Sequence, residues 1–195
     1  MTSIILIISM IFLTGYSFVN IERYSKIHYV LNKHIIEKSI HYWNNFINDS
    51  ARKYNIENKL IKSIIYAESS GNPYAKSNSN AIGLMQIKPS SAGVEIYRLN
   101  GKKGQPSIQE LYNPKINIDM GTAYIRLLQK KLFGIRNKDV MKYAMIVSYV
   151  NGVSALLKIF SKNRQEAISI INTMTTKTFS EYVKKNIQQN RPLIT

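Results

Sequence analysis

The chain has 195 residues, 45% of them hydrophobic, which is enough for one domain with its own core and an appendage. It contains no cysteine, so disulfides, a thiol nucleophile and cysteine-ligated metals are excluded. The formal net charge of +16 indicates a polyanionic partner, such as nucleic acid, an anionic membrane or a polymer bearing carboxylates. Abundant Lys, Ile and Asn also fit the mutational bias of an AT-rich genome. The three histidines form no HExxH arrangement, so no metal centre is expected.

The first apolar segment covers residues 4–19 and is nearly uncharged. It is short for a bilayer span, which needs about 20 residues, and no basic residue precedes it, unlike a typical export signal. We interpret residues 1–20 as a signal or anchor segment that associates the chain with a membrane; a buried core helix is the alternative. Arg23, Lys26 and Lys33 follow the segment, and the positive-inside rule would leave the rest of the chain in the cytoplasm.

Helical periodicity dominates the remaining sequence. We expect a helical connecting region over residues 21–53, with Trp43 in a core, and a mainly α domain over residues 54–195, with Asn55 capping its first helix. Further helices are predicted at residues 89–99, from Asn113-Pro114 to Gly134, and at residues 140–149, 155–160, 164–172 and 178–188. No run alternates over the length of a strand, so at most a small β-hairpin is expected, at residues 81–87.

The stretch from Leu60 to Ile87 places a carboxylate on the apolar face of a helix. Three isoleucines and one acid recur at i, i+3, i+4 and i+7: Ile61, Ile64, Ile65 and Glu68. Gly71 and Pro73 end the helix directly afterwards, so Glu68 is expected at its C-terminus, half-buried and facing a polar loop. Desolvation would keep such an acid protonated near neutral pH. A glutamate that simply faces solvent is the alternative.

The loop after Glu68 offers neutral polar groups and no second acid before Glu95. A glycosidase with two carboxylates needs a partner acid across the scissile bond, which only folding could bring from elsewhere. The loop side chains suit sugar hydroxyls and acetamido groups: Ser69, Ser70, Asn72, Ser77, Asn78, Ser79, Asn80 and Gln86. An ordinary Ser/Asn-rich loop remains the alternative on composition alone.

Three ordered blocks within about residues 54–185 resemble the soluble-type (family 1) lytic murein transglycosylases. The first runs from Glu68-Ser69 through Gly71-Asn72-Pro73 to Ala81-Ile82-Gly83-Leu84-Met85-Gln86-Ile87. The second, residues 113–124, is similar to the family's NP-x-x-NI-x-x-G-x-x-Y block. The third, Ser148-Tyr149-Val150-Asn151-Gly152, resembles its A-Y-N-x-G block with one residue inserted, the variant of the endo-type, membrane-bound branch.

The resemblance implies a lysozyme-like, mainly helical fold with a saccharide-binding cleft, and no cofactor. It assigns Glu68 as the sole catalytic acid/base. It places six residues around the substrate: Ser77, Ser79, Met85, Gln86, Tyr149 and Asn151. For Met85 and Tyr149, ordinary core packing is the alternative.

The implied activity is cleavage of the β-1,4 bond between N-acetylmuramic acid and N-acetylglucosamine in peptidoglycan strands, with formation of 1,6-anhydromuramic acid ends. A hydrolytic lysozyme or a non-catalytic murein-binding protein are the alternatives, the latter because no counterpart of a further active-site tyrosine is found near the C-terminus. Dispersed basic residues argue against nucleic acid. The implied location is the periplasmic side of the envelope, associated with the outer membrane, although Tyr16 stands where relatives have the lipobox cysteine.

Overall fold

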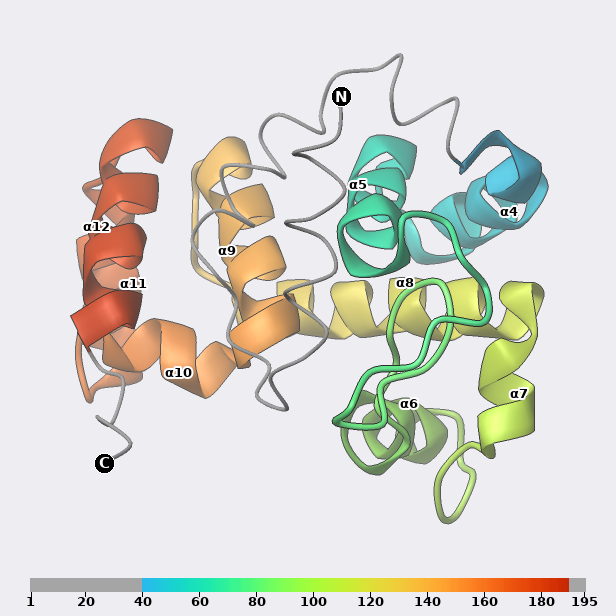
Figure 1. Ribbon diagram of the computed structural model, residues 1–195. Coiled ribbons are helices and arrows are strands. Elements are labelled where there is room, and N and C mark those ends of the chain that lie inside the picture. The colour runs from blue at the N-terminus through green and yellow to red at the C-terminus, as the bar shows by residue number, and fades with distance from the viewer. Residues whose placement is uncertain (1–39, 190–195) are drawn as a thin grey trace. The chain divides into compact units, whose positions relative to one another are not determined.

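The computed structural model describes residues 40–189 (Figure 1). The chain divides into two compact units, Met1–Tyr124 and Ile125–Thr195, and each is described by itself. The predicted signal or anchor segment, residues 1–20, lies outside the described residues, as do residues 21–39 of the expected connecting region.

Helices make up most of the described part of the first unit. They are a short 3-10 turn at His41–Trp43, α4 (Asn44–Tyr54), α5 (Asn58–Ser69), a π-helical turn at Pro89–Gly93, α6 (Val94–Leu99), α7 (Ile108–Tyr112) and the start of α8 (Pro114–Lys131). Helix α4 packs against α5, and the long loop between α5 and α6 carries the serine and asparagine residues (Figure 1).

The junction between α4 and α5 corrects one prediction. Asn55 ends α4 in a left-handed conformation, with a φ of 52°, and its backbone N–H donates to the last turn of that helix. Helix α5 then begins at Asn58, with Glu57 in the N-cap position and no side-chain cap. The expected N-cap role of Asn55 was therefore wrong: asparagine tolerates the left-handed conformation that ends a helix as readily as it caps a start.

A buried amide side chain fastens the long loop to α8. Asn117 is fully buried; its Oδ1 accepts from the Met85 N–H at 2.8 Å, and its Nδ2 donates to the carbonyls of Ile82 at 2.9 Å and Leu111 at 2.8 Å. In place of a regular hairpin, the loop has isolated bridges that join Ile82 to Lys76 and to Ile87. The loop is therefore held by the hydrogen bonds of Asn117 and by these isolated bridges, without a regular pair of strands.

One turn further along α8, Gly121 gives the loop room to approach. A Cβ at this position would overlap the side chain of Met85, which is itself fully buried. Gly83 is restricted in the same way, because a Cβ there would overlap the Asn117 amide, and its φ is +77°. The close approach of loop and helix thus requires glycine on both sides.

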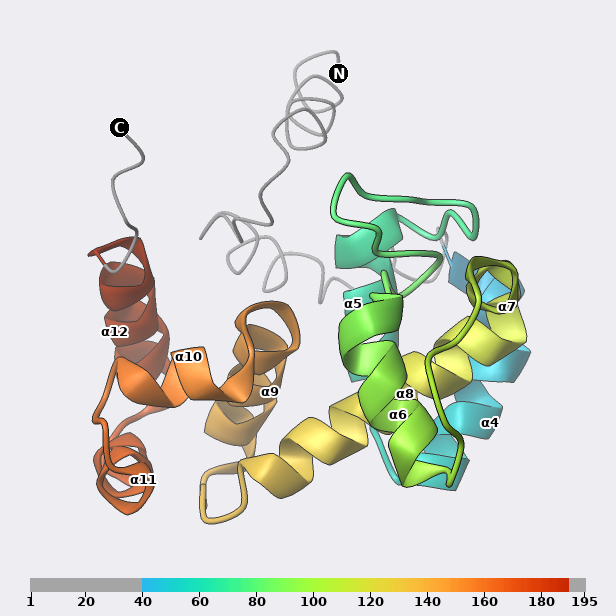
Figure 2. The same ribbon diagram turned by 90° about the horizontal axis from the view of Figure 1, so that it is seen from below.

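The second unit is built from α9 (Lys138–Asn151), α10 (Val153–Lys158), α11 (Arg164–Asn172) and α12 (Thr176–Gln189). Helix α9 packs against α10 and α12 (Figure 2). Its central residues 144–148 are buried, as predicted for this apolar helix. The predicted break at Gly152 is confirmed: this residue has a φ of 84° and separates α9 from α10. No helix within residues 40–189 has the length and apolar character needed to cross a bilayer.

Asn117→Ala tests the link between the loop and α8. The change leaves the buried Met85 N–H without its partner and removes the Asn117 donor from the carbonyls of Leu111 and Ile82, of which Ile82 keeps the Ile87 N–H. We expect a loss of roughly 3 kcal/mol in unfolding free energy. For a chain of this size that lowers the Tm by about 6–12 °C. Asn113→Ala is the matched control, because Asn113 is exposed and its side chain accepts a single hydrogen bond, from the Ile116 N–H. Equal Tm values for both variants in thermal denaturation would contradict the structural role of Asn117.

Candidate active site

Glu68 lies one residue before the end of α5 and is half-buried, as the sequence predicted. The helix stops because Ser70 takes a left-handed conformation, with a φ of 53°, and its N–H donates to the Tyr66 carbonyl. Ser69, next to Glu68, is buried, and its hydroxyl donates to the Leu84 carbonyl at 2.8 Å. The far end of the loop is therefore attached beside the candidate acid.

Two serine hydroxyls of the loop lie side by side. The Oγ atoms of Ser77 and Ser79 are 3.0 Å apart, and both residues are half-buried. The Ser77 Oγ also accepts from the Ala81 N–H at 3.0 Å, and the Ser77 N–H donates to the Ala81 carbonyl at 2.9 Å. A tight turn thus fixes the position of this hydroxyl pair before any ligand arrives.

The side chain of Gln86 forms hydrogen bonds to two backbone carbonyls within the same loop. It has a φ of 47°, and its amide nitrogen donates to the carbonyls of Ala75 at 3.1 Å and Gly83 at 2.9 Å. Met85, the preceding residue, has its side chain buried against Gly121. Met85 therefore packs in the core, the alternative noted from the sequence, while a role of either residue toward a saccharide stays a prediction.

Tyr149 and Asn151 belong to the second unit, in the last turn of α9. Both are half-buried. The Asn151 side chain donates to the Val147 carbonyl at 3.0 Å, one turn earlier in the helix. Gly152 follows with its positive φ, so the chain leaves the helix directly after Asn151.

Trp43 is a positioning residue that the sequence did not reveal. Its indole Nε1 donates to the Gly71 carbonyl at 3.1 Å, across 28 residues of sequence. Gly71 lies three residues after Glu68, so this hydrogen bond fixes the point where the chain leaves α5. We had expected Trp43 only as a core residue, and no local pattern indicates a partner so far along the chain.

Glu95, the next acid after Glu68 in the sequence, interacts electrostatically with Tyr124, a buried tyrosine of α8. Burial raises the pKa of Tyr124 to about 12, and the negative charge of Glu95 contributes to the rise. The Tyr124 hydroxyl therefore keeps its proton throughout the physiological pH range. Within residues 40–189 no three histidine, aspartate or glutamate side chains gather in a way that could hold a metal ion.

Comparison with known families places these residues in context. The Transglycosylase SLT domain family matches residues 45–172, from the second residue of α4 to the last residue of α11. The chain belongs to this family. The SLT domain thus includes nearly all of α4, and Trp43, which bonds to Gly71, lies just before the matched residues.

Two relatives of this chain are both named as lytic murein transglycosylases. This chain is 64% identical over 186 residues to membrane-bound lytic murein transglycosylase E of Buchnera aphidicola subsp. Acyrthosiphon pisum, covering 95% of this chain and 84% of the relative. It is 49% identical over 145 residues to endo-type membrane-bound lytic murein transglycosylase A of an Enterobacter strain, covering 74% of this chain and 71% of the relative.

The solved structures confirm the lysozyme-like, mainly helical fold. The 70 kDa soluble lytic transglycosylase of Escherichia coli matches with a TM-score of 0.55 and 24% identity, over 79% of this chain. An inactive mutant of the lytic transglycosylase Slt of Pseudomonas aeruginosa matches with a TM-score of 0.52 and 23% identity, over 74% of this chain. This chain spans about a quarter of the length of either protein.

Ser77→Ala and Ser79→Ala test the hydroxyl pair of the SLT domain loop. We expect each variant to fold, with at most about 1 kcal/mol of stability lost, and to lower turnover about tenfold or more, if the hydroxyls orient a sugar group at the reacting centre. Ser90→Ala is the matched control, because Ser90 is exposed in the turn before α6. Measuring turnover of murein alongside Tm separates the two roles: a Tm loss that explains all of the lost activity would favour a purely structural pair.

Proposed function

We propose that the chain is a lytic transglycosylase that cleaves murein glycan strands. The bond broken is the β-1,4 link between N-acetylmuramic acid and N-acetylglucosamine, and the products carry 1,6-anhydromuramic acid ends. The observation that supports this most directly is the placement of Glu68: a half-buried acid at a helix end, beside a loop that carries neutral hydrogen-bonding groups. Membership of the SLT family and the names of the relatives agree with it.

The proposed reaction needs one protein acid. Glu68 donates its proton to the glycosidic oxygen, and the N-acetylglucosamine side leaves as an alcohol. The muramoyl acetamido oxygen stabilises the anomeric carbon in place of a second carboxylate. Glu68, now a carboxylate, accepts the proton of the muramoyl C6 hydroxyl as that oxygen bonds to the anomeric carbon. The proton on Glu68 is restored, and no water and no cofactor are consumed.

The loop supports this route over hydrolysis. A lysozyme activates or balances water with a second carboxylate, and residues 69–94 contain none. The Ser77–Ser79 hydroxyl pair can hold an acetamido group instead. A hydroxyl already attached to the sugar also has a large effective concentration compared with solvent water.

The location follows from the substrate and from the relatives, which are named as membrane-bound. We infer a cell-envelope enzyme that works on the periplasmic side, where murein lies, in turnover and recycling of the wall. Residues 1–20 would provide the membrane association. Tyr16 cannot carry the thioether-linked lipid of a lipobox cysteine, so the anchor we propose is the apolar segment itself.

Glu68→Gln tests the acid/base assignment. The amide preserves the size of the side chain but cannot donate the proton, so murein-cleaving activity should fall by about 100-fold or more, while binding to sacculi persists. Glu181→Gln, the same chemical change at an exposed position on α12, serves as control and should be as active as wild type. Activity of the Glu68→Gln enzyme within a few-fold of wild type would remove Glu68 from the mechanism.

Product masses distinguish transglycosylase from lysozyme, since both would use Glu68 as the acid. Each muramic acid end made by an intramolecular attack lacks the elements of one water and has no reducing end. Mass spectrometry of a sacculus digest by the wild-type enzyme should therefore show anhydro products. Reducing ends alone would indicate hydrolysis, and no product of either kind would indicate a murein-binding protein.

A further inference from the structure

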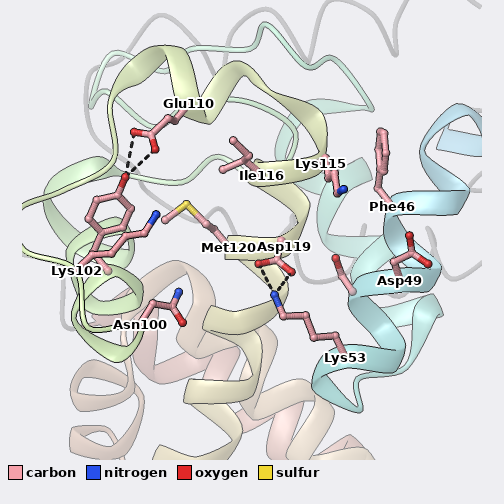
Figure 3. A pocket seen from close by; sticks show the side chains of 12 residues that line it. Phe46, Asp49, Lys53, Asn100, Lys102, Glu110, Lys115, Ile116, Asp119 and Met120 are labelled. Atoms are coloured by element: carbon pink, nitrogen blue, oxygen red, sulfur yellow. Dashed lines mark hydrogen bonds and ion pairs between the residues drawn. The ribbon is translucent and has the colours of Figure 1, made fainter.

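A recess of about 440 Å³ opens in the first unit between α4, the α6–α7 region and the start of α8 (Figure 3). Its volume falls within the range of small-molecule sites. The side chains used below are Phe46, Lys53, Lys102, Lys115, Ile116 and Met120. No residue from Glu68 to Ile87 lines the recess, so it is separate from the loop that carries the candidate active site.

Helix α8 separates the recess from that loop. Asn117 and Gly121 contact the loop, whereas Asp119 and Lys115, which line the recess, lie about 200° around the helix axis from Asn117 at 3.6 residues per turn. One helix therefore supports the loop on one face and forms a wall of the recess on the other.

The carboxylates of the recess already have partners. Asp119 accepts from the Lys53 ammonium at 2.8 and 3.0 Å (Figure 3). It also accepts from the Tyr54 hydroxyl at 2.9 Å. Glu110 accepts from the Tyr97 hydroxyl at 2.9 and 3.0 Å and from the Ser107 N–H at 2.8 Å. These bonds, with the Lys102 charge, lower the pKa of Glu110. The recess thus has little acceptor capacity left for a ligand.

Two ammonium groups of the recess form no ion pair with a carboxylate of the described residues, although the charge of Lys102 acts on Glu110 from a longer distance. Among residues 40–189, neither Lys102 nor Lys115 forms an ion pair; the Lys102 Nζ lies over the Tyr97 ring, 5.0 Å from its centroid. Phe46, Ile116 and Met120 add apolar surface. A fitting ligand accepts hydrogen bonds from ammonium groups and presents small apolar parts to these side chains.

The charge balance distinguishes between anionic ligands. Three lysines and three acids line the recess, so its formal charge is zero: Lys53, Lys102, Lys115, Asp49, Asp119 and Glu110. A polyanion or an anionic bilayer gains little long-range attraction from a neutral lining. A short ligand with a single carboxylate can accept charge-assisted hydrogen bonds from the two ammonium groups of Lys102 and Lys115.

We propose that this recess binds a carboxylate of the peptide stems attached to murein, through Lys102 and Lys115. The proposal rests on the proposed function, because murein is the source of the peptide. It assigns the recess to substrate recognition at a distance from the cleaved bond, with the stem alanine methyls against the apolar side chains.

The test measures binding to the full chain carrying Glu68→Gln, so that no turnover interferes. The probes are a murein fragment whose stem peptide has free carboxylates, the same fragment with amidated carboxylates, and a peptide-free glycan of equal length. Lys102→Gln combined with Lys115→Gln removes the two charges. Lys184→Gln combined with Lys185→Gln, both exposed on α12, makes the same change of net charge elsewhere. Tm values confirm that all variants fold.

We expect the Lys102/Lys115 variant to raise the Kd for the free-carboxylate fragment about tenfold, the size of a lost charge-assisted hydrogen bond. Its affinity for the amidated fragment and for peptide-free glycan should equal that of the Glu68→Gln parent, and the Lys184/Lys185 variant should match the parent for every probe. An unchanged Kd, or an equal loss in both double variants, would overturn the proposal. Phosphatidylglycerol vesicles serve as a fourth probe, and a loss of binding confined to these vesicles would also overturn the proposal, because it would indicate a membrane contact.

The outcomes also separate this inference from the proposed function. If the wild-type chain cleaves no sacculi but the carboxylate-dependent binding is present, the recess is confirmed and the transglycosylase reaction is wrong. If the chain cleaves sacculi and the Lys102/Lys115 variant binds like its parent, the reaction stands and the recess has another role.

Discussion

The amide of Asn117 is the interaction on which the candidate active site most depends. Its oxygen accepts from the Met85 N–H, and its nitrogen donates to the carbonyls of Ile82 and Leu111. Backbone hydrogen bonds and two isolated bridges satisfy part of this loop, and the Asn117 side chain from α8 supplies further partners. The Ser69 hydroxyl and the Trp43 indole add two attachments near Glu68. The serine pair therefore sits on a loop held at several points rather than on a free one.

Local patterns in the sequence predicted the helices well. Residues 164–172 form α11 with the predicted bounds, and the apolar run around residues 144–148 is the buried centre of α9. These predictions succeeded because periodicity and stop signals act within a few residues of one another. The prediction that Asn55 caps the start of α5 was wrong. Whether an asparagine ends one helix or begins the next depends on its backbone conformation, which the residue type alone does not determine.

The site was only partly accessible to the same reasoning. Glu68 was placed at a helix end because its helix face and its stop signals are local. The bond from Trp43 to Gly71 spans 28 residues, and the bond from Asn117 to the Met85 N–H spans 32. The periodicity of apolar residues does not indicate contacts between residues so far apart in the sequence. The recess beside α4 joins residues from 46 to 120, so it too could be found only once the chain was folded.

The position of Glu68 bears on how a single acid can serve both steps of the proposed reaction. Glu68 is half-buried in the last turn of α5, beside the loop. The proposed reaction asks this one carboxyl group to give a proton to the glycosidic oxygen and then to take one from the C6 hydroxyl. A second carboxylate nearby would stabilise the anomeric cation but would compete for that proton. A loop that offers hydroxyls and amides instead is therefore consistent with chemistry that closes a ring within the sugar.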